Sequence, residues 1–317
     1  TPYKRIPTRM TIKEVTPDQY AALPLKHPHV FNTAAFSRLN AAKAERLHFL
    51  VFEEEGKPRY GITLGEREGW LLSPFSAPFG GFSYCKTPHI ESLDAAAQML
   101  ADYAHDLEFR MRISLPPLFY ATQFLAETAA VLSRRSSATH IELNYHFPVS
   151  RFADYDRCLA RNARKNLRHA EEQEWEFVAV WRDDAEGLRK AFEVIRRNRE
   201  EHGYRLSMTL AEVERTVKLI PADFFLLRHG GEDVAAAQVF HVADGIVQVV
   251  YWGDLHAYSS LRTMNMLVYR VFEHYSRAGL DVLDIGTSML GGAPNYGLCD
   301  FKTSVGCEAS PKFVLEF

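Results

Sequence analysis

"DFFLLRHGGEDVAAAQVFHVADGIVQVVYW", residues 223–252, contains three apolar runs separated by the short turns GGED and ADG. Each run has the length of an ordinary strand, and glycine and aspartate between such runs are typical of hairpin connections. The stretch therefore predicts three antiparallel strands joined as a meander.

The same order of elements occurs twice in the chain. Each copy has three strands, then a helical pattern, then one more strand. In chain order the copies cover residues 47–52, 60–66, 69–75, 92–111 and 112–117, and residues 223–229, 234–242, 246–252, 259–279 and 281–288. An ordered repeat of this kind predicts two related domains.

The two predicted domains differ in what precedes each meander. Helical segments are expected at 155–172, 184–202 and 209–219 before the second meander, and at 32–44 before the first. Pro148 separates an apolar strand from a charged helix, which places the boundary between domains 1–148 and 149–317. The fold class is α/β (α+β), each domain being a mixed, mostly antiparallel sheet flanked by helices.

Composition limits the possible functions. The chain has 317 residues, 47% of them hydrophobic and 24% charged, as in an ordinary soluble globular protein. A net charge of −3 argues against a DNA-binding protein, and no apolar run is long enough for a membrane segment. The four cysteines and thirteen histidines lack metal-ligand spacing, so we expect reduced thiols, no metal and a cytoplasmic protein.

A second informative stretch is residues 281–308, DVLDIGTSMLGGAPNYGLCDFKTSVGCE. Its glycines and the pair Lys302-Thr303 suggest a phosphate-binding loop at first. The two positions that such a loop fills with glycine are Tyr296 and Phe301, and the following residues are strand-like. The sequence therefore argues against a nucleotide loop.

The strand that opens this stretch carries Asp284, Gly286 and Ser288 at alternate positions, which predicts that all three face the same way. Gly286 indicates either close approach of a ligand or a β-bulge. Lys302 is expected on the next strand, where its charge could meet an anion. The alternative is that Lys302 pairs with Asp284 or lies in solvent.

The motif made of these residues resembles the C-terminal signature of the FemAB and FemX-like acyltransferases. Residues 159–178 are also similar to the basic helix and following strand of that family, and residues 234–286 to its last meander strands, helix and strand. The signature residues in this chain are Asp284, Gly286, Ser288, Phe301, Lys302 and Gly306.

The resemblance implies two tandem GNAT-like domains, the fold of acyl-CoA N-acyltransferases. Members attach an acyl or aminoacyl group to an amine, and the best known use aminoacyl-tRNA to build peptidoglycan cross-bridges. It implies that Lys302 stabilises the oxyanion formed when the amine attacks. The expected acceptor is a small-molecule amine, such as a cell-wall or nucleotide-linked precursor.

Amine attack also requires a base, because the attacking nitrogen must lose a proton. The segment YWGDLH places Asp254 and His256 just past a strand end, and we expect them to act in catalysis. Tyr251, Asp284, Gly286, Ser288 and Phe301 are expected to bind substrate. The alternative for Asp254 and His256 is an ordinary surface turn.

The acyl donor is either aminoacyl-tRNA or an acyl-CoA, with no tightly bound cofactor. GNAT enzymes that use acetyl-CoA hold its pyrophosphate with a glycine-rich turn before the central helix. The corresponding residues here, SSLRTMNM at 259–266, contain no glycine. An acetyl-CoA-dependent N-acetyltransferase and a non-catalytic binding module remain as alternatives.

A basic helix provides the last functional pattern. Its cations fall on one stripe, and no acidic residue lies between Asp156 and Glu171 to neutralise them. The stripe consists of Arg157, Arg161, Arg164, Lys165 and Arg168. We expect Arg161, Arg164 and Arg168 to bind a phosphate-bearing substrate such as tRNA, and the alternative is a solvated face paired with nearby acids.

Overall fold

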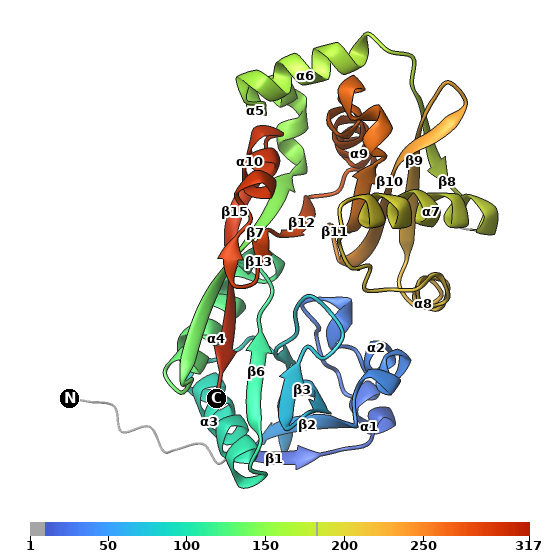
Figure 1. Ribbon diagram of the computed structural model, residues 1–317. Helices are drawn as coiled ribbons and strands as arrows, with labels where there is room; N and C mark the ends of the chain where they lie inside the picture. Colours follow the sequence, from blue (N-terminus) through green and yellow to red (C-terminus); the bar gives the residue numbers. More distant parts are fainter. Residues whose placement is uncertain (1–9, 182) are drawn as a thin grey trace. The chain divides into compact units, whose positions relative to one another are not determined.

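The computed structural model describes residues 10–181 and 183–317, and the chain forms two compact units (Figure 1). Unit 1 extends to Glu142 and also includes Pro311–Phe317, whereas unit 2 is Leu143–Ser310. The predicted boundary after residue 148 lies slightly later than this division. The assignment of the last residues to the second domain is corrected, because Val314–Glu316 pair with a strand of unit 1.

Unit 1 is built on a mostly antiparallel sheet with strand order β1-β2-β3-β4-β6-β15, and a short strand, β5, pairs with β3. Its strands are β1 (Met10–Glu14), β2 (Arg46–Glu54), β3 (Lys57–Arg67), β4 (Trp70–Ser73), β5 (Ser83–Tyr84), β6 (Arg110–Ser114) and the end of β15 (Glu308–Glu316). Its α-helices are α1 (Pro17–Ala21), α2 (Ala34–Leu39), α3 (Ile90–Asp106) and α4 (Thr122–Ser133).

Unit 2 has a sheet of order β7-β12-β11-β10-β9-β8 and a separate ribbon, β13-β14. The strands are β7 (Ala138–Pro148), β8 (Glu176–Val180), β9 (Ala222–His229), β10 (Glu232–Ala243), β11 (Ile246–Asp254), β12 (Val282–Thr287), β13 (Met289–Leu290) and β14 (Ala293–Pro294). The α-helices are α5 (Tyr155–Cys158), α6 (Arg161–Glu171), α7 (Ala185–Glu201), α8 (Leu210–Thr216), α9 (Thr263–Ala278) and α10 (Tyr296–Ser304).

The predicted repeat is confirmed by strand pairing. In unit 1, helix α3 connects β4 to β6, and these two strands pair in parallel. In unit 2, helix α9 connects β11 to β12, which also pair in parallel. All other pairings with a defined register in both sheets are antiparallel. Each unit thus contains the same meander, crossover helix and parallel strand.

The two faces of the sheet in unit 2 are covered by different helices. Ala235, Ala237 and Val239 of β10 belong to one hydrophobic core with Leu267 and Phe272 of α9. The intervening positions of the strands face α7, because a Cβ on Gly253 of β11 would meet the side chain of Asn198. Figure 1 shows α7 crossing the strands of this sheet.

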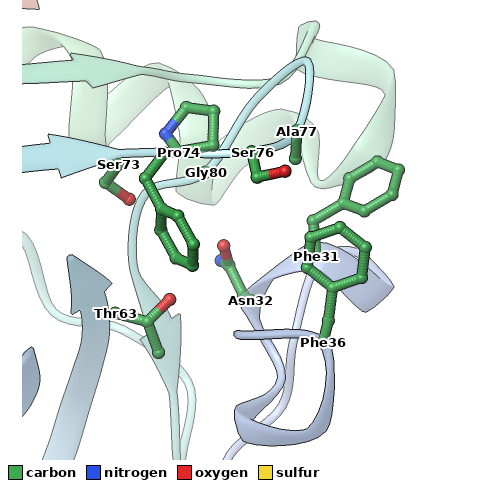
Figure 2. Close-up of a pocket in the computed structure, with 10 residues that line it drawn as sticks. Phe31, Asn32, Phe36, Thr63, Ser73, Pro74, Ser76, Ala77 and Gly80 are labelled. Carbon is green, nitrogen blue, oxygen red and sulfur yellow. The ribbon is translucent and has the colours of Figure 1, made fainter. Parts of the chain in front are cut away.

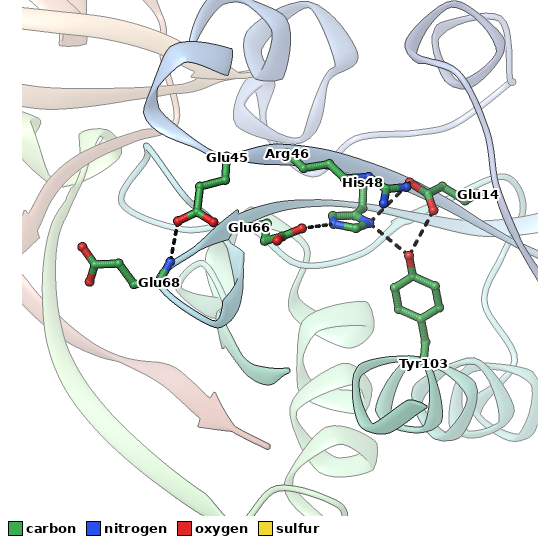
Figure 3. Close-up of polar contacts among 7 residues, drawn as sticks. All are labelled: Glu14, Glu45, Arg46, His48, Glu66, Glu68 and Tyr103. Carbon is green, nitrogen blue, oxygen red and sulfur yellow. Dashed lines mark hydrogen bonds and ion pairs between the residues drawn. The ribbon is translucent and has the colours of Figure 1, made fainter. Parts of the chain in front are cut away.

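A buried polar cluster joins three strands and a helix in unit 1 (Figure 3). The Nδ1 atom of His48 on β2 lies 3.0 Å from the Tyr103 hydroxyl of α3, and its Nε2 lies 3.3 Å from Glu66 on β3. Tyr103 also donates to Glu14 of β1 at 3.2 Å. Burial, followed by the charge of Glu14, raises the pKa of Tyr103 to about 12, so its hydroxyl stays a donor.

No α-helix within the described part of the chain combines the length and the apolar character that crossing a membrane requires.

Candidate active site

Strands β11 and β12 pair over a short distance and then part. The parallel register covers Ile246–Gln248 and Val282–Asp284. After this point β12 continues along β7, whereas β11 continues along β10 as far as Asp254. The backbone groups on the facing edges of β11 and β12 therefore form no ladder bonds to each other beyond Gln248.

Asp284 lies where the parting begins, and its side chain is fully buried. It accepts hydrogen bonds from Asn144 Nδ2 at 2.7 Å, Gln248 Nε2 at 2.9 Å and the Gly286 amide at 2.8 Å. These bonds connect β7, β12 and β11 through one carboxylate. Neither amide partner was expected from the sequence, although a glutamine in the apolar run IVQVV is a visible signal of a buried polar contact.

Gly286 forms a β-bulge, which was one of its two predicted roles. The register of β12 against β7 shifts between Asp284 and Gly286, and Gly286 has φ +76°. A Cβ at this position would meet no atom within 4 Å, so the backbone angle rather than crowding requires glycine. The expectation that Asp284, Gly286 and Ser288 share one face of a strand is wrong, because the bulge interrupts the alternation and β12 ends at Thr287.

Lys302 lies on helix α10, and its predicted place on a strand is therefore wrong. Asn295 begins this helix, because its side chain accepts a hydrogen bond from the Leu298 amide. The Lys302 side chain is buried, with a residue exposure of 2%, which excludes the solvated alternative. The helix turns the lysine back toward the end of β12.

The ammonium group of Lys302 is held by the backbone of the bulge. Its Nζ donates to the carbonyl oxygens of Ile285, Gly286 and Thr287 at 3.0, 3.0 and 3.1 Å. Burial lowers the pKa of Lys302 to about 8, and the charge of Asp284 is among the effects that oppose this shift. The site thus keeps a desolvated cation beside the parting strands.

Two other signature residues lie beside this lysine. The Ser288 side chain is buried, and its Oγ has no hydrogen-bond partner within the described residues. Phe301 is partly buried and packs against the core of unit 2. The ring of Tyr145 lies 5.5 Å from Lys302 Nζ, a cation–π distance. The buried Ser288 hydroxyl therefore remains a polar group without a partner beside Lys302.

The residues predicted as bases lie at the other strand, β11. Asp254 ends β11, and burial raises its pKa to about 6. His256 is exposed in a 3₁₀ helix, His256–Leu261, and its amide donates to Glu201 at 2.9 Å. Neither side chain forms a hydrogen bond or ion pair with Lys302 in the described ranges. The Lys302 ammonium, carried by α10, thus lies against the end of β12, and the Asp254 carboxylate lies at the end of β11.

Tyr251 lies on β11 and is almost completely buried. Its hydroxyl bonds to the side chain and amide of Ser207, and its ring lies 5.4 Å from the guanidinium carbon of Arg199. Sequence reasoning missed Arg199 because it falls among several other cations near the end of α7.

The turn before α9 differs from an anion-binding loop. It is the 3₁₀ helix His256–Leu261, and Arg262 after it takes the left-handed conformation at φ +61°. The Glu201 carboxylate accepts the His256 amide, so an acidic group already lies at the start of this turn. A negative charge there is unfavourable for a pyrophosphate.

The predicted helix 155–172 is split into α5 and α6, so Arg157 lies outside the helix that carries the rest of the cationic stripe, and Arg164 has a different role. Arg164 donates to the carbonyl oxygens of Asp156 and Leu159 and pairs with the Asp156 carboxylate at 3.2 Å. The expectation that Arg164 is free for a phosphate is therefore wrong, because it fastens α5 to α6. Arg161, Lys165 and Arg168 are exposed and form no ion pair with another described residue.

A small pocket lies within unit 1 (Figure 2). Aromatic rings form part of its wall, and Asn32 and Thr63 add polar groups. Asn32 is held by a hydrogen bond from its Nδ2 to the Phe82 carbonyl oxygen at 3.4 Å. The complete lining is Phe31, Asn32, Phe36, Thr63, Ser73, Pro74, Phe75, Ser76, Ala77 and Gly80. The pocket's volume of about 10 Å³ leaves room for little more than one water molecule.

Comparisons with known proteins identify the fold. Residues 157–303 match the family described as acetyltransferase (GNAT) domain. The chain is similar to the crystal structure of FemX, with TM-score 0.64 and 12% identity over 96% of both chains. It is also similar to a tandem GNAT protein from the clavulanic acid biosynthesis pathway, with TM-score 0.52 and 10% identity over 97% of this chain and 98% of that one.

A third similar structure is L-PGS from Bacillus licheniformis, with TM-score 0.55 and 12% identity over 81% of this chain and 80% of that one. A search of curated proteins finds no match. The predicted tandem GNAT-like fold and the resemblance to FemX are confirmed.

Proposed function

Because residues 157–303 form a GNAT domain and the whole chain has the fold of FemX, we propose that the protein is an N-acyltransferase. It transfers an acyl or aminoacyl group to an amine acceptor, such as a cell-wall or nucleotide-linked precursor. The observation that carries this proposal is the parting of β11 and β12, with the buried Lys302 cation beside one strand and Asp254 at the end of the other.

The reaction follows from these two groups. The amine nitrogen attacks the acyl carbonyl carbon, a C–N bond forms, and negative charge develops on the carbonyl oxygen. The positive charge of Lys302 stabilises this oxyanion, and Asp254 accepts the proton that the nitrogen loses. The C–O or C–S bond to the donor then breaks, and the departing oxygen or sulfur takes up a proton. Asp254 supplies that proton, which is the one it accepted from the amine, so the step balances without a proton from solvent.

We assign the donor to the aminoacyl-tRNA class rather than the acyl-CoA class. The turn before α9 contains no glycine, and Glu201 takes its first amide, so a pyrophosphate finds few donors there. Arg161, Lys165 and Arg168 provide an exposed cationic face on α6 that suits nucleic-acid phosphates. Transfer from aminoacyl-tRNA, with none from acetyl-CoA, supports this assignment, and the reverse result contradicts it.

The pH dependence of transfer tests the role of Asp254. A base must be deprotonated, so kcat/KM should fall as the pH drops below about 6, the raised pKa of this carboxyl. Asp254→Asn should remove this acidic limb and lower kcat/KM about 100-fold, as measured by a pH–rate profile of each protein. A variant that keeps the limb, or loses less than about threefold, contradicts the role.

The stability of the same variant gives an independent readout. Because the folded pKa of Asp254 lies above its ordinary value of 3.8, the folded state binds the extra proton, and stability falls as the pH rises from about 4 to about 6. At pH 7 Asp254→Asn should therefore be more stable than the parent by up to about 2 kcal/mol. Urea unfolding at pH 4 and pH 7 measures the difference.

The salt dependence of tRNA binding tests the cationic face. Replacing Arg161 and Arg168 together by Gln should flatten the slope of log K against log salt by roughly 1 to 2, because two phosphate contacts are lost. Arg164→Gln is the matched control: it should reduce stability through the lost α5–α6 contacts and leave the slope nearly unchanged. An unchanged slope in the double variant contradicts the assignment.

A further inference from the structure

Gln238 is a polar side chain in the middle of an apolar strand. It lies on β10 between Ala237 and Val239, and it is fully buried. Neither its Nε2 nor its Oε1 has a hydrogen-bond partner among the described residues. Buried amide groups without partners are unfavourable, so a residue that served packing alone would be apolar here. The orphaned amide therefore points to a ligand.

The strand register shows what lies beside Gln238. Its Cα partner on β11 is Tyr251, and its partner on β9 is Phe224. All three side chains lie on the face of the sheet that α7 covers, the same face on which Gly253 meets Asn198. A shift of register follows directly after Gln238. The amide is thus aimed between the sheet and α7, next to the tyrosine.

Arg199 of α7 brings a second orphaned group to the same tyrosine. Its guanidinium carbon lies 5.4 Å from the Tyr251 ring and 6.0 Å from the Tyr204 ring. The Nε atom is buried without a hydrogen-bond partner, and the side chain forms no ion pair with a residue that the structure describes. Burial lowers the pKa of Arg199, as expected for a cation that lacks an acidic neighbour.

The segment between α7 and α8 covers this group. Gly203 has φ +65° and follows the last turn of α7, and Tyr204–Ser207 have no regular structure. Ser207 is exposed, whereas Tyr251, to which its amide donates at 3.2 Å, is buried. The contact between Ser207 and Tyr251 therefore ties this segment to the sheet beside Gln238.

We propose that Gln238, Arg199 and Tyr251 form a recognition site for an amine that carries a carboxylate, and that residues 203–208 close over it. The carboxylate accepts from Arg199 Nε and Gln238 Nε2, and an N–H group of the ligand donates to Gln238 Oε1. These are the atoms that lack partners in the free protein. The inference rests on the proposed function in one respect, that the bound amine is the acyl acceptor.

Arginine side-chain NMR of the full chain tests the site directly. The probes are alanine in both enantiomers, propionate, which lacks the amine, and ethylammonium, which lacks the carboxylate. The Arg199 Nε–H signal, identified by its loss in Arg199→Lys, should shift most with one alanine enantiomer, less with propionate and not with ethylammonium. Arg196, an exposed neighbour on α7 paired with Glu193, should keep its signal in place.

A substitution at Gln238 separates a ligand site from a packing role. Gln238→Leu removes the orphaned amide, so it should raise Tm by a few degrees. It should also weaken alanine binding at least tenfold, about 1.4 kcal/mol. Binding within twofold of the parent, or no Arg199 shift with any probe up to about 50 mM, overturns the proposal. Because the readout is binding, it stands or fails separately from acyl transfer.

Discussion

Lys302→Met should lower the rate of amine acylation at least 100-fold and the free energy of unfolding by about 2 to 3 kcal/mol. The first effect follows because removing a group that stabilises an oxyanion costs about 10² to 10³ in rate. The second follows because the carbonyl oxygens of Ile285, Gly286 and Thr287 lose a charged donor in a buried place. Turnover per folded molecule and urea unfolding measure the two effects.

Lys312→Met is the matched control for this substitution. Lys312 is also buried, and its Nζ donates to the Pro78 carbonyl oxygen at 3.1 Å and pairs with Glu142 at 2.8 Å within unit 1. It should lose comparable stability and keep turnover within about threefold. If Lys302→Met loses stability but keeps its rate within that range, Lys302 only fastens the bulge, and the oxyanion role is contradicted.

The pH profile adds a second test of Lys302. Burial lowers the pKa of Lys302 from its ordinary value of 10.5 to about 8, so folding disfavours the charged form. The cation should therefore be lost above about pH 8, and kcat should fall there in the parent protein. Lys302→Arg keeps the charge at that pH and should abolish the alkaline limb, even if its larger head lowers the rate.

The sequence predicted those parts of the fold, the strands and hairpins, that follow from local periodicity. Apolar runs and glycine-containing turns located the meander 223–252 and its earlier copy, because strands and hairpins leave their pattern in neighbouring residues. Pairing between distant segments leaves no such pattern. The end of β15 pairs with β6, about 200 residues earlier, and this contact moves Pro311–Phe317 into unit 1.

The sequence predicted which residues form the candidate site better than it predicted where their side chains lie. The motif identified Asp284 and Lys302, but Asn295 begins a short helix that a glycine-rich pattern conceals. The single backbone angle at Gly286 changes which side chains share a face, and the glycine alone did not decide between a bulge and close approach of a ligand. Arg164 looks like its neighbours in the stripe, and only the chain path shows that it binds carbonyl groups.

Asp284 connects the fold to the site. Its carboxylate holds amide groups from β7 and β11 and the backbone of its own strand, at the place where β11 and β12 part. The same bulge presents the carbonyl oxygens that hold Lys302. The position of the Lys302 ammonium therefore depends on the Asp284 carboxylate, although no direct hydrogen bond between the two side chains is needed for this.

Asp284→Ala should lower the free energy of unfolding by about 3 to 5 kcal/mol, because buried donors on Asn144 and Gln248 lose a charged acceptor. It should also lower the pKa of Lys302 further, since the charge of Asp284 acts to raise it. The alkaline limb of kcat should consequently move to lower pH. Urea unfolding and a pH–rate profile measure these effects.

Asp223→Ala is the control that removes a hydrogen-bonded carboxylate without changing the charge next to Lys302. Asp223 on β9 accepts from Tyr275 at 2.8 Å and contacts His241 Nε2 at 2.6 Å, but its side chain is about one-third exposed. Solvent can replace these partners, so this variant should lose only about 1 to 2 kcal/mol and leave the alkaline limb in place. Equal losses in the two variants, with the limb unmoved in both, would show that Asp284 supports the strands without tuning Lys302.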